Sequence, residues 1–222
     1  MQDVAVKIIS TAYLTHNVKQ FIVEKPDGYV FTPGQGTDVS IDKDGWRDKK
    51  SSFTFTSLNA SSTLEFIVKI YRNHHGVTEQ LEKLQNGDGL IVREPWGALT
   101  YEGPGVFISG GNGITPFIAI LRQLEADRKL VGNMLIASYR TSDDVLLDDE
   151  FKTMLETEYF KVFTRENVVG FLDARIDEDF LVKTVKDFNR KFYICGPGEF
   201  TEDLQRMLTN LGVKSEALVV ED

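Results

Sequence analysis

Cysteine, histidine and long apolar runs are all scarce in this 222-residue sequence. The one cysteine, Cys195, excludes an internal disulfide framework and an iron–sulfur cluster, which needs about four thiolates. One cysteine and three histidines also fall short of a structural zinc site, so we expect no metal and an organic cofactor for any redox chemistry. No stretch approaches the roughly 20 apolar residues that span a bilayer, and the first residues lack the basic and apolar regions of a signal peptide. We therefore expect a cytoplasmic protein with no membrane partner.

Positive charge is scarce as well, since 25 Lys and Arg stand against 34 Asp and Glu, which gives a net charge of -9. That balance repels nucleic acid, and no basic stripe with interleaved aromatic residues appears, so we exclude nucleic acid as a partner. The charge is uneven, because residues 1–102 have a net charge of -2 and residues 103–222 a net charge of -7. We expect an anionic cofactor to bind the first half, near its basic residues Arg47, Lys49, Lys50, Lys69 and Arg72.

The first half contains short β-rich segments separated by turn residues. The only helical pattern in it covers residues 78–84, with Thr78 as the expected N-cap. Six or so short strands with one helix predict a closed antiparallel β-barrel domain over residues 1–102. The expected strands are residues 4–13, 18–24, 37–41, 52–57, 64–71 and 90–93.

The second half, beyond a linker at residues 101–105, alternates short apolar strands with amphipathic helices. Five strands alternating with four helices predict a parallel, doubly wound α/β domain of the nucleotide-binding type over residues 103–222. The expected strands are residues 106–109, 134–138, 160–164, 192–195 and 217–220, and the expected helices are residues 115–130, 148–155, 178–188 and 200–211.

A glycine-rich segment, residues 108–116, follows the first strand of this sheet and opens its first helix. Glycines there let the backbone approach a pyrophosphate, and the helix N-terminus supplies unpaired N–H groups and a positive dipole. Pro116 suits a first-turn position, which needs no N–H. The pattern favours a dinucleotide site at Gly111, Gly113 and Thr115, and the alternative is a turn that only packs the helix on the strand.

A second motif, Cys195-Gly196-Pro197, follows the fourth strand of the same sheet. It lies at the carboxyl edge, where open α/β sheets bind their ligands. The tight turn at Gly196 and Pro197 leaves the Cys195 side chain near any ligand on that edge. The alternative is packing alone, because free cysteine is among the most buried residue types.

A third pattern lies in the first half, where residues 52–57 alternate hydroxyl and aromatic side chains. A flat ring system could stack on Phe53 and take a hydrogen bond from Thr54. An ordinary barrel strand with one polar face is the alternative for this segment.

Taken in order, these motifs resemble the ferredoxin–NADP reductase family of flavin oxidoreductases over nearly the whole chain. The resemblance implies that Phe53 stacks on the isoalloxazine ring of a flavin and that Thr54 reaches its N5. It also implies that the backbone at residues 76–78 holds the flavin phosphates. In the second half, it implies that residues 110–116 hold the pyrophosphate of a nicotinamide dinucleotide and that residues 195–197 meet the nicotinamide.

Three positions depart from the family's pattern. Ser51 replaces the arginine that pairs with a flavin phosphate, and nearby lysines can compensate only as point charges. The stacking residue is Phe53 where tyrosine is commoner. The chain also lacks the terminal aromatic residue that covers the flavin in many relatives. The resemblance suggests Glu221 near the active centre, with a solvated tail as the alternative.

The nucleotide preference is predicted from Thr164-Arg165, which follows the third strand of the sheet, and from Arg175 beyond it. Similar pairs in the family meet the 2′-phosphate of NADP, and a guanidinium binds phosphate well. The sequence therefore favours NADP, with NAD as the alternative. The resemblance favours FAD as the flavin, with FMN left open.

The complete set of predicted site residues combines the motifs with the resemblance. The predicted catalytic residues are Thr54, Cys195 and Glu221, and the predicted cofactor-binding residues are Phe53, Thr54, Phe55, Thr56, Lys69, Gly76, Val77, Thr78, Gly111, Gly113, Thr115, Pro116, Thr164, Arg165, Arg175, Cys195, Gly196 and Pro197.

The resemblance implies a flavoprotein reductase that takes hydride from NAD(P)H and passes single electrons to ferredoxin, flavodoxin or an oxygenase component. Because such carriers are acidic, we expect them to dock on the less negative first half, against Arg47, Lys49, Lys50 and Arg72. Two alternatives stay open. The chain could be a flavin-binding electron-transfer subunit of a larger complex, or a module that has lost its flavin because Ser51 replaces arginine.

Overall fold

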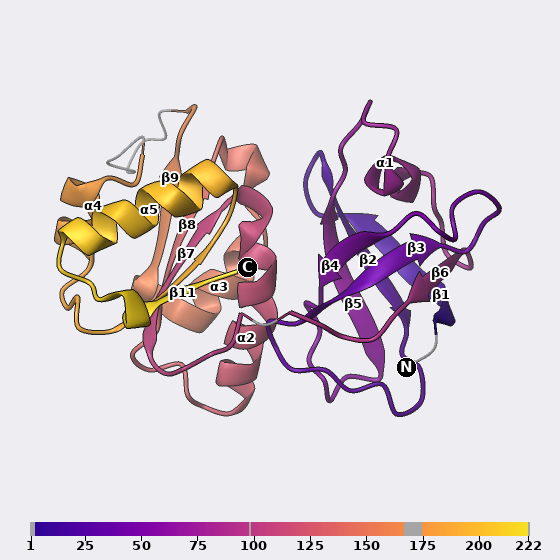
Figure 1. The fold of residues 1–222 in the computed structure, drawn as a ribbon, viewed down its shortest axis with the longest axis horizontal. Helices are drawn as coiled ribbons and strands as arrows, with labels where there is room; N and C mark the ends of the chain where they lie inside the picture. Colours follow the sequence, from indigo (N-terminus) through magenta and orange to yellow (C-terminus); the bar gives the residue numbers. More distant parts are fainter. Residues whose placement is uncertain (1–2, 98, 167–174, 222) are drawn as a thin grey trace. The chain divides into compact units, whose positions relative to one another are not determined.

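The computed structural model describes residues 3–97, 99–166 and 175–221, which form two compact units (Figure 1). Unit 1 comprises Met1–Ala98 with Ile118–Gln123, and unit 2 comprises Leu99–Phe117 with Leu124–Asp222. The sequence places the boundary between residues 102 and 103. An antiparallel barrel and a parallel α/β sheet, the two architectures that the sequence predicts, are both confirmed.

Unit 1 is a nearly closed antiparallel β-barrel. Its strands are β1 (Val4–Tyr13), β2 (Val18–Glu24), β3 (Gly36–Ile41), β4 (Ser51–Thr54), β5 (Thr63–Lys69) and β6 (Gly89–Val92), in the order β4-β3-β6-β1-β2-β5. In β2 the side chains alternate, and Phe21 and Val23 lie in the barrel core. The N–H of Thr56, just beyond β4, donates to the carbonyl of Glu65 on β5 (2.9 Å) and so joins the two edge strands.

The short helix α1 (Val77–Glu82) begins earlier than the sequence predicts. Gly76 is its N-cap, with an extended backbone and no side-chain cap, so the prediction of Thr78 as the cap is wrong. The reason is the burial of Val77 in the barrel core, which holds that residue in the first turn of the helix. The Glu79 carboxylate accepts a hydrogen bond from the N–H of His75 (2.7 Å), just outside the helix.

Unit 2 is a five-stranded parallel sheet with helices on both faces. Its strands are β7 (Gly105–Gly110), β8 (Met134–Tyr139), β9 (Tyr159–Phe163), β10 (Lys191–Cys195) and β11 (Leu218–Val220), in the order β11-β10-β7-β8-β9, and its helices are α2 (Thr115–Ala126), α3 (Asp148–Leu155), α4 (Glu178–Thr184) and α5 (Gly198–Asn210). Leu181 of α4 and Leu204 of α5 share a core with Ile108 on one face. On the opposite face, Phe117 of α2 meets Phe107 edge-on, with ring centroids 5.1 Å apart.

Two helices of unit 2, α2 and α4, end four residues before the apolar pattern predicts. α2 stops at Ala126, because Arg128 is left-handed (φ 58°) and the N–H of Lys129 bonds back to the carbonyl of Leu124 (2.7 Å). α4 stops before Val185, whose extended backbone buries the side chain in the core instead of continuing the helix. Among the described residues, no helix combines the length and apolar character needed to cross a membrane.

The linker at residues 101–105 is fastened to the sheet of unit 2 by Tyr193. This fully buried tyrosine accepts a hydrogen bond from the N–H of Glu102 (2.8 Å) and donates one to the carbonyl of Gly103 (2.7 Å). Burial raises the pKa of Tyr193 to about 12, so its hydroxyl stays a donor at neutral pH. Gly105 leads directly into β7, and its N–H donates to Asn133 Oδ1 (3.1 Å).

Candidate functional site

The glycine-rich loop lies at the carboxyl end of β7, where a 3-10 turn (Gly111–Ile114) leads into α2. Gly111 adopts a φ of 54°, and a Cβ atom built on it meets nothing within 4 Å, so its backbone is open to a ligand. Pro116 lies in the first turn of α2, and Thr115 Oγ1 donates to the carbonyl of Asn112 (3.1 Å). An open backbone in front of a helix of 12 residues fits the pyrophosphate of a dinucleotide.

Gly113 brings this loop into contact with the second motif of the same sheet. A Cβ atom at Gly113 would lie 2.4 Å from the carbonyl oxygen of Cys195 and 2.7 Å from the nitrogen of Gly196, so no other residue fits without a backbone shift. Gly196 is constrained in turn, because a Cβ there would lie 2.7 Å from the ring of Phe200. Two motifs some 80 residues apart in the chain therefore form one surface at the carboxyl edge of the sheet, as the sequence pattern predicts.

Cys195 lies at the end of β10, and only 5% of it is exposed. Its Sγ donates a hydrogen bond to Glu221 Oε2 (2.9 Å), so the structure brings these two predicted catalytic residues together, and their catalytic role stays a prediction. Burial, and then the neighbouring Glu221 carboxylate, raises the pKa of the Cys195 thiol. The thiol therefore stays protonated at neutral pH, where it acts as a hydrogen-bond donor and not as a nucleophile.

A carboxylate that the sequence analysis did not select lies beyond β8 and β9, at the carboxyl edge of the sheet. Thr164 and Arg165 follow β9, as predicted, and Glu166 comes directly after them. Glu166 Oε2 accepts hydrogen bonds from both the N–H (2.6 Å) and the hydroxyl (2.9 Å) of Ser142, which follows β8. A carboxylate at a strand end of this edge can accept a hydrogen bond from a ribose hydroxyl, and its place after a strand was the signal that could have found it.

Arg175, the third residue predicted for the 2′-phosphate, is exposed in the chain that leads into α4. It follows residues 167–174, which lie outside the described part of the chain. The hydrogen bonds of this region instead join the segments after β8 and β9, where the N–H of Arg165 donates to the carbonyl of Arg140 (2.9 Å).

The barrel strand with the aromatic and hydroxyl pattern leaves two of its four predicted ring contacts accessible. Phe53 and Thr54 are partly exposed, and Phe53 also packs against Phe66, with ring centroids 6.5 Å apart. Phe55 and Thr56 are fully buried: Phe55 stacks on Phe31 at 4.1 Å, and Thr56 Oγ1 donates to the carboxylate of Glu65 (2.7 Å). The side chains of Phe55 and Thr56 are thus excluded as cofactor contacts, because β4 ends at Thr54 and both residues turn into the barrel.

The segment predicted for the flavin phosphates lies before and within the first turn of α1. Gly76 is extended, and the nearest atom to a Cβ built on it is the carbonyl oxygen of His74 at 4.0 Å, so its backbone is open. Val77 faces the core, and Thr78 is half-buried behind it. Lys69, at the end of β5, places its ammonium 5.7 Å from the ring centroid of Tyr71. An open main chain suits a phosphate through its N–H groups, and a lysine could add only a point charge.

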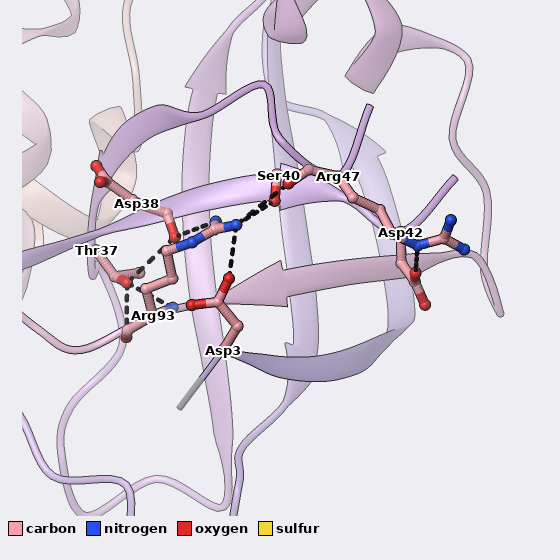
Figure 2. Close-up of polar contacts among 7 residues, drawn as sticks. All are labelled: Asp3, Thr37, Asp38, Ser40, Asp42, Arg47 and Arg93. Atoms are coloured by element: carbon pink, nitrogen blue, oxygen red, sulfur yellow. Dashed lines mark hydrogen bonds and ion pairs between the residues drawn. The ribbon is translucent and has the colours of Figure 1, made fainter. Parts of the chain in front are cut away.

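A buried guanidinium organises the charged surface of unit 1 (Figure 2). Arg93 donates to Ser40 Oγ (2.9 Å) and to the carbonyl of Arg47 (3.2 Å), and it pairs with the Asp3 carboxylate (3.0 Å). The side chain of Arg47 points the other way and pairs with Asp42 (2.8 Å). Arg93 therefore fixes the main chain of the loop after β3, while Arg47 is neutralised on the loop's own surface.

Ion pairs neutralise two arginines of the predicted docking face, which itself stays a prediction. The sequence treats Arg47 and Arg72 as available positive charges, but Arg72 pairs with the Glu82 carboxylate (2.8 Å), as Arg47 does with aspartate. The Lys49 ammonium lies 4.1 Å from the ring centroid of Trp46, and Lys50 is exposed. Of the four basic residues in the predicted docking face, Lys49 and Lys50 are therefore the two whose charge no ion pair within the described residues neutralises.

Comparisons with known proteins agree with this geometry. Residues 107–206 match the oxidoreductase NAD-binding domain family. The chain is 27% identical over 228 residues to NADH-cytochrome b5 reductase 1 of Eremothecium gossypii, a match that covers 92% of this chain and 78% of that protein. It is also 27% identical over 192 residues to the anthranilate 1,2-dioxygenase electron transfer component of Acinetobacter baylyi, with 80% and 54% covered.

The fold also resembles that of a solved reductase. A ferredoxin NADP+ reductase from Neisseria gonorrhoeae, solved with bound FAD and NADP, superposes with a TM-score of 0.85 at 21% identity, covering 100% of this chain and 98% of that one. The sequence matches, the shared fold and the order of the motifs lead to one conclusion. The chain is similar in sequence and fold to NAD(P)H-dependent flavoprotein reductases of the ferredoxin–NADP reductase type, and residues 107–206 match the NAD-binding domain family.

Proposed function

We propose that this flavoprotein reductase holds FAD on unit 1, oxidises NADH on unit 2, and delivers electrons singly to a separate acidic carrier protein. The observation that carries the proposal is the 2.4 Å approach between a Cβ at Gly113 and the carbonyl of Cys195, which unites the pyrophosphate loop with the nicotinamide motif. When bound, the flavin supplies the conversion between hydride and one-electron chemistry. The chain's own residues bind, orient and hold protons in place.

In unit 2, the backbone around Gly111 and the first turn of α2 bind the pyrophosphate through N–H groups. The Cys195 thiol and the Glu221 carboxylate offer a donor and an acceptor at the nicotinamide end. Because the pKa of the thiol is raised, its proton stays on Sγ, and the pair orients the ligand without itself transferring a proton.

In unit 1, Phe53 offers its exposed face for stacking, and Thr54 offers a hydroxyl for a hydrogen bond to the ring edge. The main chain at residues 76–78, with the Lys69 ammonium, binds the flavin phosphates. Ser51 cannot make the bidentate bond of an arginine, so we expect the flavin to dissociate more readily than it does from relatives with that arginine.

The preference for NADH rests on Glu166, in place of the NADP that the sequence favours. Its carboxylate is held by two hydrogen bonds from Ser142, so it is fixed for a ribose hydroxyl and repels a 2′-phosphate. The cytochrome b5 reductase relative is named for NADH. Arg165 is the residue through which NADP could still bind, so the preference between the two nucleotides has to be measured.

Anaerobic titration of the yellow protein with NADH and NADPH measures that preference directly. We expect bleaching at a lower concentration of NADH. Glu166→Gln removes the charge and keeps an acceptor, so it should shift the preference towards NADPH by about tenfold. Glu202→Gln, on the exposed face of α5, is the matched control and should leave the ratio unchanged. A wild-type preference for NADPH, or a Glu166→Gln ratio equal to that of the control, contradicts the assignment.

The acceptor is proposed from the relatives and from the surface charge. The relatives' names give cytochrome b5 and a dioxygenase as acceptor classes, and the motif resemblance adds ferredoxin and flavodoxin. An acidic carrier should dock against Lys49 and Lys50. Lys49→Glu with Lys50→Glu should lower kcat/KM for such a carrier about tenfold at low salt and leave dye reduction intact. Lys183→Glu with Lys186→Glu on unit 2 changes the net charge equally, and an equal loss from both pairs rules out this docking face.

A flavin-binding subunit of a larger complex remains the second candidate. Gel filtration of the native protein separates the two, since a stable stoichiometric partner favours the subunit. Extraction and chromatography of the bound flavin distinguish FAD from FMN. A preparation that stays colourless in excess of both flavins contradicts either candidate.

A further inference from the structure

Ser109 is a fully buried residue near the carboxyl end of β7, and within the described residues its hydroxyl has no hydrogen-bond partner. Buried polar groups are paired as a rule, and an unpaired hydroxyl destabilises the folded chain. Alanine would fill nearly the same space without that destabilisation. A buried hydroxyl that lacks a partner and lies next to a predicted binding site indicates a role in that site, since stability alone would favour alanine.

The register of the sheet sets this serine beside Cys195. β7 and β10 are neighbouring parallel strands in which Ser109 pairs with Cys195, so both side chains point to the same face from strands about 4.8 Å apart. On the far side of β10, Glu221 follows β11, whose Val220 pairs with Ile194. Cys195 therefore lies between Glu221 and Ser109, in one row across the carboxyl edge of the sheet.

The thiol has one proton, and its bond to Glu221 uses it. Glu221 is exposed, so a ligand with an N–H or O–H group can compete for its carboxylate. If the thiol had no second acceptor, that competition would leave a buried S–H group unpaired. Cysteine has three staggered χ1 rotamers, and a rotamer that turns Sγ away from Glu221 is what the thiol needs to reach the neighbouring strand of Ser109.

We propose that Ser109 is a positioning residue: its hydroxyl accepts the hydrogen bond of the Cys195 thiol when Glu221 turns to a ligand. Only hydrogen bonds are exchanged, and no covalent bond changes. The inference rests on the proposed function, in which residues 195–197 meet the nicotinamide end of the dinucleotide. Glu221 is then free to accept a donor of that ligand, such as an amide N–H, while the thiol stays paired and in place.

Infrared spectroscopy of the S–H stretch tests the exchange without any nucleotide. Cys195 is the only cysteine of the chain, so the band reports on this thiol alone. In Glu221→Ala, we expect the band to remain at a hydrogen-bonded position, because the thiol turns to Ser109. In Glu221→Ala with Ser109→Ala, the band should move to the position of a free thiol. Identical bands from the single and the double variant overturn the proposal.

A second test uses Ser109→Ala, which should make the protein more stable but weaken its affinity for NADH. Ser109→Ala should raise the Tm of the flavin-loaded protein by about 2–4 °C, because it removes an unpaired buried hydroxyl. The same variant should weaken NADH binding about fivefold, measured as the Kd in an anaerobic titration. Ser40→Ala is the matched control, since Ser40 is equally buried but accepts a bond from Arg93 (2.9 Å), so it should lower the Tm and leave the Kd unchanged.

A Ser109→Ala variant that binds NADH as the wild type does, or that loses stability as Ser40→Ala does, overturns the positioning role. The outcome is separable from a failure of the proposed function. A wild-type protein that binds no pyridine nucleotide refutes the proposed function, while the infrared comparison still decides whether the thiol turns to Ser109.

Discussion

Gly113→Ala is the substitution for which the structure makes the sharpest prediction. The new Cβ would lie 2.4 Å from the carbonyl oxygen of Cys195, whereas ordinary contact begins at 3.4 Å, so the loop or the strand end must move by roughly 1 Å. The atoms in the way are main-chain atoms of β10 and of the turn after it, which cannot rotate aside. Overpacking of this kind destabilises a fold by about 1–3 kcal/mol.

The same displacement should act on ligand binding, because it separates the pyrophosphate loop from the Cys195 motif. A shift of that size costs up to about a hundredfold in a step that depends on positioning. Urea unfolding of the flavin-loaded protein measures the loss of stability, and stopped-flow reduction by NADH measures the loss of rate. Gly198→Ala is the control, since its Cβ meets nothing within 4 Å at the start of α5 and should stabilise by roughly 0.4–1 kcal/mol. If Gly113→Ala matches this control in stability and in rate, the close packing of the two motifs is not what holds the site together.

Three further predictions concern stability. Tyr193→Phe removes both hydrogen bonds to the linker and should destabilise unit 2 by about 1–3 kcal/mol in urea unfolding. The spectrum of the bound flavin should not change, and an unchanged unfolding midpoint refutes the anchoring role. The raised pKa of the Cys195 thiol means that the folded chain keeps a proton that the unfolded chain loses above about pH 8.5, so the unfolding free energy should fall as pH rises beyond that point, by up to roughly 1.4 kcal/mol per pH unit. Cys195→Ser should remove this slope, and identical pH profiles for the two proteins would falsify the thiol assignment. Arg93→Gln should destabilise the barrel by about 1.5–3 kcal/mol, because it removes the hydrogen bonds and the ion pair of the buried guanidinium. Tryptophan fluorescence follows the unfolding, since both tryptophans lie in unit 1. If Arg93→Gln costs less stability than the same substitution of an exposed arginine, the buried guanidinium does not hold the loop.

The architecture was predictable because its signals are local. Alternation with period two marked the barrel strands, and apolar strands alternating with helices marked the parallel sheet. The glycines and Pro116 needed only their place between a strand and a helix to predict an open loop with a helix start. The helix ends were predicted less well. α2 and α4 stop where tertiary contacts make another backbone conformation better, and the apolar pattern contains no sign of that.

What the sequence by itself determined is the fold class and the order of the motifs, because these follow from periodicity and turn chemistry along neighbouring residues. The residues expected to meet a flavin and a dinucleotide rest on the motifs and on the family resemblance, and they stay predictions. Only the tertiary structure decided which of those residues meet. It set Cys195 between Glu221 and Ser109, buried Phe55, and gave Glu166 its partners. It also neutralised Arg47. Each of these outcomes depends on strand register or on a pairing across distant segments, and such contacts have no signature in the local sequence.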